Sequence, residues 1–142
     1  MFKSGNYIEK VLYTAKTHTT GGREGVARSD DGHLDVRFST PGAHGDGTNP
    51  EQLFAAGWSA CFLGAMKKAS LLMKVPFPKD AAVDAEVDLG TTDDAYFLQA
   101  RLSISLPGVD RPIAQEIAYA AHQICPYSKA THGNINVDIK VV

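Results

Sequence analysis

The sequence predicts an α+β domain in which antiparallel sheets surround one long buried helix. Segments that alternate apolar and polar residues occur before, between and after two helical segments, which gives the order strands, helix, strands, helix, strand. That order contains no repeating βαβ unit, so an antiparallel sheet is favoured over a parallel doubly wound one. The chain has 142 residues, enough for one domain and few for two. We therefore expect residues 1–142 to form a single domain.

Composition excludes some classes of partner. The net charge is −2, and 44% hydrophobic with 21% charged residues is ordinary for a globular protein, so nothing favours nucleic acid or an anionic membrane. Residues 1–7 lack the apolar run of a signal peptide, and the apolar-rich stretch 53–66 is too short to span a bilayer. We expect a cytoplasmic protein, in which thiols are kept reduced.

The first third of the chain predicts short strands and loops. Residues 11–18 and 34–38 alternate with the period of half-buried strands. Between them, the glycine-rich segment 21–25 predicts a turn. Three glycines and a proline predict a loop over residues 40–48.

The central segment predicts a long helix over residues 50–74. Asn49 is typical of a helix cap, and Pro50 suits the first helical position. The segment is apolar on nearly every face, which predicts a core helix covered on several sides. Pro76 and Pro78 end it.

The last third predicts a hairpin, a second helix and a final strand. Residues 83–89 and 96–106 alternate as strands and are joined by a turn around 91–94. A helix begins near residue 110 and ends at Cys125, before a proline. Residues 135–141 alternate as the last strand.

The two cysteines are the candidate reactive groups. Cys61 lies in the third turn of the central helix, beside an apolar stripe of Trp58, Phe62 and Met66 that is more typical of a core than of a substrate pocket. As a free cysteine it is equally consistent with simple packing. Cys125, at the end of a helix, is open to packing or function. In a reduced compartment such a pair is catalytic, metal-binding or simply buried.

A reactive thiol at position 61 requires a nearby cation. Burial raises a thiol pKa, and the helix dipole fades after the first turn. Lys68 shares a helix face with Cys61, but lysine is compact and strongly hydrated. Arg23, in the 21–25 turn, stays charged and presents a planar fork that can serve a thiolate and a carboxylate together. Glu51 is either an ordinary first-turn acid or the carboxylate that pairs with Arg23.

Other chemical motifs are weak. The histidines show no paired metal-ligand spacing, which disfavours zinc. There is no CxxC motif, and the glycines between residues 42 and 47 fit neither the GxGxxG nor the Walker pattern.

Three motifs carry a family resemblance. Residues 49–62 (NPEQLFAAGWSACF) resemble the first cysteine block of the organic hydroperoxide resistance proteins, within the OsmC-like superfamily. Residues 125–131 (CPYSKAT) with 133–135 (GNI) are similar to their second block, and 12–15 (LYTA) with 21–23 (GGR) to their N-terminal block. The likeness runs in the same order through nearly the whole chain.

The resemblance implies an OsmC-like α+β fold, an intertwined homodimer with active sites at the subunit interface, and a thiol peroxidase without metal or haem. It implies that Cys61 attacks organic hydroperoxides and that Cys125 resolves the oxidised product. Arg23 and Glu51 would be the activating pair. The implied electron donor is dihydrolipoamide or a lipoylated protein rather than thioredoxin. Trp58 departs from the pattern, since the family often has tyrosine there, and the loop before residue 49 is short.

Two questions stay open at this stage. Ten residues along a helix is about 15 Å, so Arg23 either bridges part of the distance from Glu51 to Cys61 or comes with Glu51 from a partner chain. A non-catalytic binding dimer is the alternative function. A redox sensor would share the chemistry, but the chain lacks a basic recognition helix.

Overall fold

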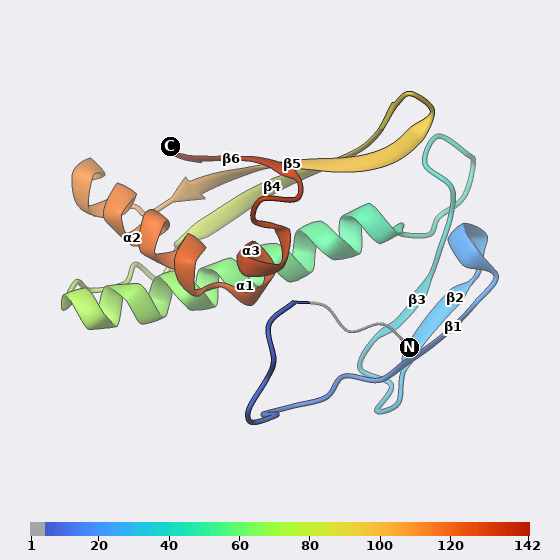
Figure 1. The fold of residues 1–142 in the computed structure, drawn as a ribbon, viewed down its shortest axis with the longest axis horizontal. Helices are drawn as coiled ribbons and strands as arrows, with labels where there is room; N and C mark the ends of the chain where they lie inside the picture. Colours follow the sequence, from blue (N-terminus) through green and yellow to red (C-terminus); the bar gives the residue numbers. More distant parts are fainter. Residues whose placement is uncertain (1–4) are drawn as a thin grey trace. The chain divides into compact units, whose positions relative to one another are not determined.

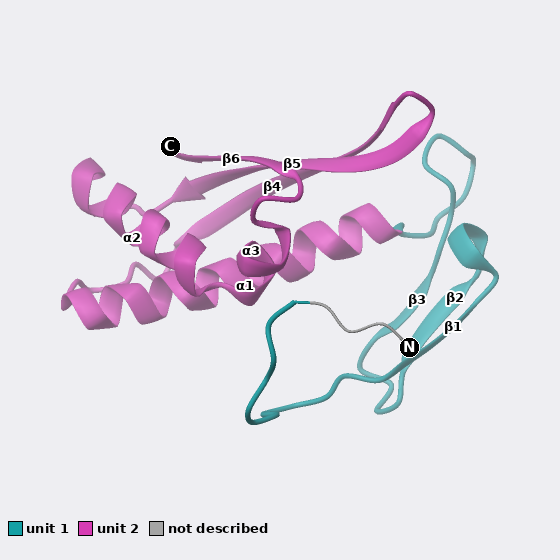
Figure 2. Ribbon diagram, in the orientation of Figure 1, with its two compact units in different colours: residues 1–49 teal, residues 50–142 magenta. Residues whose placement is uncertain are grey.

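The computed structural model describes residues 5–142. No signal peptide is expected over residues 1–7. The first four of these residues lie outside the described part of the chain. The chain divides into two compact units, residues 1–49 and 50–142 (Figure 2). The single domain that the sequence predicts over residues 1–142 stays a prediction.

The first unit holds a small antiparallel sheet. Its strands, in order, are β1 (Thr17–Thr20), β2 (Val26–Ser29) and β3 (Asp35–Arg37). The predicted strand at 34–38 is confirmed, while β2 was not predicted. The predicted strand at 11–18 is wrong except at its end, because residues 11–16 form no strand. The register explains this, since Thr17 already pairs with Ser29, the last residue of β2, so β2 offers no partner to residues before Thr17.

The second unit has three helices, which lie on one face of its sheet (Figure 1). They are α1 (Pro50–Met73), α2 (Arg111–Ile124) and the short α3 (Pro126–Thr131). The two long helices confirm the prediction. The third was missed, because Pro126 was taken only as a helix stop. Proline is also favoured at the first helical position, which is where Pro126 lies in α3.

The sheet of the second unit is mixed rather than purely antiparallel. Strands β4 (Ala82–Thr92) and β5 (Ala95–Ser105) form the predicted hairpin. Its turn places Asp93 and Asp94 at φ of 49° and 64°, as a two-residue type I′ turn requires. Strand β6 (Asn136–Val141) pairs with β5 in parallel. The reason is topological: α2 and α3 carry the chain back across the sheet between β5 and β6, so one βαβ crossover is present.

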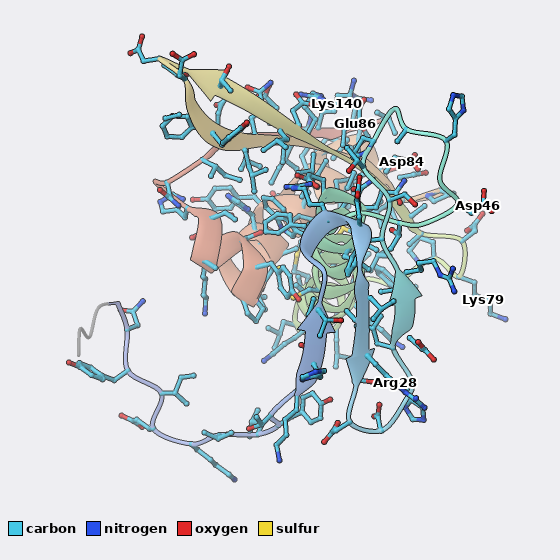
Figure 3. The ribbon with its side chains drawn as sticks, turned by 90° about the vertical axis from the view of Figure 1, so that its right-hand side faces the viewer. Arg28, Asp46, Lys79, Asp84, Glu86 and Lys140 are labelled. Atoms are coloured by element: carbon cyan, nitrogen blue, oxygen red, sulfur yellow. The ribbon has the colours of Figure 1, made fainter. Side chains whose placement is uncertain are left out.

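Alternation along the strands separates a polar face of this sheet from an apolar one. Exposed or half-exposed polar residues on β4, such as Asp84 and Glu86, share their face with Lys140 of β6 (Figure 3). On this face Arg101 of β5 forms hydrogen-bonded ion pairs with Asp88 and Glu86. The other face carries the buried residues of β5, Ala100, Leu102 and Ile104. The helices therefore cover the apolar face.

Helix α1 is buried along one face only. Trp58, Phe62 and Met66 are fully buried, as the predicted core stripe requires. Outside this face, Leu71 and Leu72 are 77% and 70% exposed. The expectation that α1 is covered on several sides is therefore not met within one chain. Although α1 has 24 residues, neither it nor another helix within residues 5–142 has the length and hydropathy that crossing a bilayer requires.

Helix α1 ends in a Schellman motif. The amide of Val75 donates to the carbonyl of Ser70 at 2.9 Å, and that of Lys74 to Leu71 at 3.2 Å. Lys74 takes the left-handed position, with φ 58°, where glycine is usual. The helix is thereby terminated before Pro76 and Pro78 are reached.

Candidate active site

The structure brings Cys61 and Cys125 into contact. Cys61 projects from α1, and Cys125 is the residue that ends α2 and caps α3. Both are free thiols, and the Cys125 thiol donates to the Cys61 sulfur at an Sγ–Sγ distance of 3.2 Å. Two positions that are 64 residues apart in the chain thus form one dithiol.

The two thiols differ in their access to solvent. Cys125 is fully buried, whereas Cys61 is half-buried. Burial raises the pKa of the Cys61 thiol, and the adjacent Cys125 acts in the same direction, first through the hydrogen bond between the two thiols and then through charge repulsion. The backbone amide of Tyr127, in the first turn of α3, opposes this by a hydrogen bond to the Cys61 sulfur. The second unit by itself therefore favours a neutral thiol at Cys61.

Helix α3 packs against one turn of α1 beside this dithiol. The indole N–H of Trp58 donates to the Ser128 hydroxyl at 3.1 Å, and both side chains are fully buried. The ring of Tyr127 lies over Gly57, where a Cβ would come 3.2 Å from the tyrosine hydroxyl. Phe54 meets the ring of Trp58 edge-on at 5.5 Å. Trp58 is in the core as the sequence predicts, whereas no role was predicted for Ser128 and Tyr127. The sequence offers one signal for Ser128, which is its position one helical turn after Cys125.

Arg23 belongs to the first unit and lies in the short 3₁₀ helix η1 (Gly22–Glu24) between β1 and β2. The turn predicted over residues 21–25 is confirmed, and it contains this 3₁₀ helix. Gly21 and Gly22 have φ of 75° and 59°, a left-handed pair that L side chains resist. The amide of Gly25 closes η1 on the carbonyl of Gly22 at 3.2 Å. The glycines thus shape the loop that presents Arg23.

Glu51 lies in the first turn of α1, where a carboxylate complements the helix dipole. At 1.5 Å per residue it is about 15 Å along the axis from Cys61. Lys68, the other cation considered, is exposed and about 10 Å beyond Cys61 on the same helix. Neither residue reaches the Cys61 sulfur by helix geometry alone.

Two histidines lie together elsewhere in the second unit. The rings of His122, in α2, and His132, just after α3, are 6.3 Å apart and nearly perpendicular. The Nδ1 atom of His122 is buried without a hydrogen-bond partner among the described residues. Burial, and then the neighbouring His132, lower the pKa of His122. Within residues 5–142 no three His, Cys, Asp or Glu side chains are grouped so that they could hold a metal ion.

Comparison with known proteins supports the resemblance. The profile of the OsmC-like protein family matches residues 43–140. The organic hydroperoxide resistance protein of Xanthomonas axonopodis pv. citri is 50% identical over 135 residues, covering 92% of this chain and 95% of its own. The crystal structure of the organic hydroperoxide resistance protein OhrB of Bacillus subtilis is 40% identical and superposes with a TM-score of 0.88, covering 93% of this chain and 100% of its own. That of an organic hydroperoxide resistance protein from Legionella pneumophila is 36% identical, with a TM-score of 0.87 and coverage of 93% and 98%.

These relatives span almost the whole chain, and the α+β fold agrees with theirs. The paired cysteines lie in the motifs on which the resemblance was first based. The chain therefore belongs to the organic hydroperoxide resistance proteins of the OsmC-like family.

Proposed function

We propose that the protein is a thiol peroxidase that reduces organic hydroperoxides to alcohols through a Cys61–Cys125 disulfide. The observation that carries this proposal is the 3.2 Å separation of two free thiol sulfurs. A packing role would not require the two thiols to meet, since each could fill apolar space alone. A two-cysteine reaction requires that they do.

The difference in burial supports Cys61 as the residue that reacts first. The half-buried Cys61 is open to a peroxide, whereas the fully buried Cys125 is not. The Cys61 thiolate attacks one oxygen of ROOH, the O–O bond breaks, and the protonated alkoxide leaves as ROH. Cys61 becomes a sulfenic acid, and its sulfur has been oxidised by two electrons.

The second step is intramolecular. The Cys125 thiol attacks the sulfenic sulfur, forms the S–S bond and releases water. A disulfide has a bond length of about 2.05 Å, so the sulfurs must approach by about 1.2 Å from their present separation. An external dithiol then reduces the bond by exchange. We propose dihydrolipoamide or a lipoylated protein for this role.

We propose that Arg23 lowers the pKa of Cys61 and that Glu51 orients the guanidinium. The need for a cation follows from the burial that raises the pKa of Cys61. Support comes from the glycine-shaped loop that presents Arg23 and from the family motifs that contain both residues. Mixed dimers of Cys61→Ser with Arg23→Ala subunits separate two versions of this idea. Recovery of one active site indicates donation across the subunit interface, and no recovery indicates donation within a chain.

We propose a homodimer because one chain leaves two apolar surfaces exposed. The N-terminal arm, residues 5–16, is exposed throughout and carries large apolar side chains. The outer face of α1 does so at Leu71 and Leu72. A second copy of the chain would remove both from water. Sedimentation equilibrium tests this, and a monomer at micromolar concentration would exclude it.

The experiment for the main proposal is a thiol count in denatured protein, before and after one equivalent of cumene hydroperoxide. Two thiols per chain should be lost and then recovered with dihydrolipoamide, but not with thioredoxin. The Cys125→Ser variant should instead stop at a sulfenic acid that dimedone traps. No loss of thiols would favour a non-catalytic binding dimer.

A further inference from the structure

Two contacts of different chemistry, one helical turn apart on α1, join this helix to α3 and to Cys125, the residue that caps α3. The first is the Cys61–Cys125 sulfur contact at 3.2 Å. The second is the Trp58–Ser128 hydrogen bond at 3.1 Å. Trp58 precedes Cys61 by three residues, and Ser128 follows Cys125 by three. Residues three apart within α1 share a helix face, so the two contacts lie side by side on this face of α1.

We propose that the Trp58–Ser128 hydrogen bond is a positioning contact for the resolving step, holding α3 so that the Cys125 sulfur stays within reach of oxidised Cys61. The inference rests on the proposed peroxidase function and adds two residues to it. Neither residue touches the peroxide. Both act through Cys125.

Burial makes the Trp58–Ser128 hydrogen bond costly to break. The indole N–H and the hydroxyl are both removed from water, so neither has solvent as an alternative partner once the bond is broken. At its start, α3 is joined to α2 through the Cys125 amide, which donates to Ala121 at 2.8 Å. The helix has six residues and few internal hydrogen bonds. Its position on α1 therefore depends on the side chains that meet α1. Of its two buried polar residues, Ser128 bonds to α1, whereas the Thr131 hydroxyl donates to carbonyls within α3 itself.

Competition between two reactions makes positioning measurable. Sulfenic acid at Cys61 either condenses with the Cys125 thiol, giving the disulfide and water, or meets a second ROOH, giving sulfinic acid and ROH. The first reaction depends on where Cys125 lies, and the second does not. A displaced Cys125 therefore shifts product from disulfide to sulfinic acid as the hydroperoxide concentration rises, while the initial attack keeps its rate.

The test compares Ser128→Ala and Trp58→Phe with wild type by stopped flow and intact mass. A misplacement near 1 Å reduces an intramolecular rate by roughly ten- to a hundredfold, so at least a tenfold slower disulfide formation is expected, with sulfenic acid formation unchanged within about twofold. Ser128→Thr, which retains the hydroxyl, should restore the wild-type ratio of disulfide to sulfinic acid. The double variant should be no worse than either single one, because both remove the same contact.

Ser70→Ala is the matched control. Ser70 is also a buried serine, 1% exposed, but its hydroxyl has no hydrogen-bond partner among the described residues. Removal of this hydroxyl should leave the ratio of disulfide to sulfinic acid as in wild type. Trp58 is also the single tryptophan of the chain, so loss of its hydrogen-bond acceptor in Ser128→Ala should shift its emission to shorter wavelength.

A second measurement keeps this inference separate from the peroxidase proposal. The Cys61–Cys125 disulfide is formed with oxidised lipoamide, and its reduction potential is measured without any peroxide. A tenfold loss of effective thiol concentration makes the potential of Ser128→Ala about 30 mV less negative. If wild type forms no disulfide with peroxide but the 30 mV difference is present, the peroxidase proposal fails and the positioning contact stands. Equal potentials and equal partition in wild type and Ser128→Ala overturn the positioning role, as does an equal effect of Ser70→Ala.

Discussion

The aromatic ring of Tyr127 packs directly on the backbone of Gly57, leaving too little space for an ordinary side chain between α1 and α3. A Cβ at position 57 would lie 3.2 Å from the tyrosine hydroxyl and 3.4 Å from a ring carbon. The first distance is tighter than usual van der Waals contact, and the second is at its lower limit. Tyr127 is 41% exposed, so its ring has room to move outward by a few tenths of an ångström. Gly57 thus permits the close approach of α3, the helix that Cys125 caps.

We predict that Gly57→Ala slows disulfide formation but leaves the free energy of unfolding nearly unchanged. Alanine in a helix interior gains about 1 kcal/mol over glycine, which offsets the displacement of Tyr127, so urea unfolding should change by less than about 1 kcal/mol. The conversion of sulfenic acid to disulfide should nevertheless slow severalfold. Gly64→Ala is the control, because nothing lies within 4 Å of its Cβ position. Equal disulfide rates in the two variants would contradict the prediction.

Removal of Arg23 should move the pH dependence of the first step. A cation stabilises the charged thiolate and so lowers its pKa. Its loss in Arg23→Ala should therefore raise the pH midpoint of the cumene hydroperoxide reaction, by about 1–3 units. At a fixed pH below the midpoint, each pH unit by which the midpoint rises reduces the thiolate fraction tenfold. Stopped-flow rates between pH 5 and 10 measure this.

Arg28→Ala provides the comparison for Arg23, since it removes an arginine from β2 of the same unit (Figure 3). Its midpoint should equal that of wild type. A common shift in both variants would point to the net charge of the unit rather than to a specific contact with Cys61.

Longer alkyl hydroperoxides should be better substrates. Each CH₂ group buried in the transition state contributes up to about 0.8 kcal/mol, which is roughly fourfold in kcat/KM. Phe54, two helical turns before Cys61 on α1, and Tyr127, two residues after Cys125, favour such burial, since their ring centroids lie 6.3 Å apart. A straight-chain series should therefore rise stepwise in kcat/KM, with hydrogen peroxide lowest. Equal kcat/KM for hydrogen peroxide and cumene hydroperoxide would contradict the proposed preference for organic hydroperoxides.

His122 should make the fold less stable in mild acid. Its pKa is lowered in the folded state by burial and by His132, so the unfolded chain binds more protons below about pH 6.5. Stability is therefore lost as the pH falls through that value. In His122→Asn, the urea midpoint should decline less between pH 7.5 and 5. His132→Asn should have a smaller effect in the same direction, and a steeper decline in either variant would refute the assignment.

Lys74→Gly should stabilise the second unit. The left-handed conformation at φ 58° costs an L residue about 1–2 kcal/mol, while glycine loses about 0.5–1 kcal/mol more than alanine through chain entropy. The net gain should be up to about 1 kcal/mol in the free energy of unfolding. Lys74→Ala separates the effect of charge from that of conformation, and it should show no gain. If both variants are equally stable, the strain at this position is negligible.

The sequence was informative where periodicity and end signals agree. Pro50 begins α1 and the hairpin turn lies at Asp93 and Asp94, both close to their predicted positions. Alternation could not assign the direction of β6, because a strand shows the same side-chain pattern in parallel and antiparallel pairs. Residues 11–16 show that pattern too, but the sheet has no partner strand for them.

For the site, the family motifs identified both cysteines, and the structure placed their sulfurs in contact. Ser128 was missed because its role depends on Trp58, 70 residues away. No local spacing encodes such a contact. Arg23 and Glu51 stay predictions, since they lie in different compact units.

The complete burial of Cys125 has a consequence for covalent inhibitors. An electrophile of moderate size should alkylate one sulfur per native chain, that of Cys61. Because the proposed reaction needs both sulfurs, a single modification should also deprive Cys125 of its reaction partner. A fragment directed at the half-buried Cys61 would then inactivate the protein irreversibly, without having to enter the core.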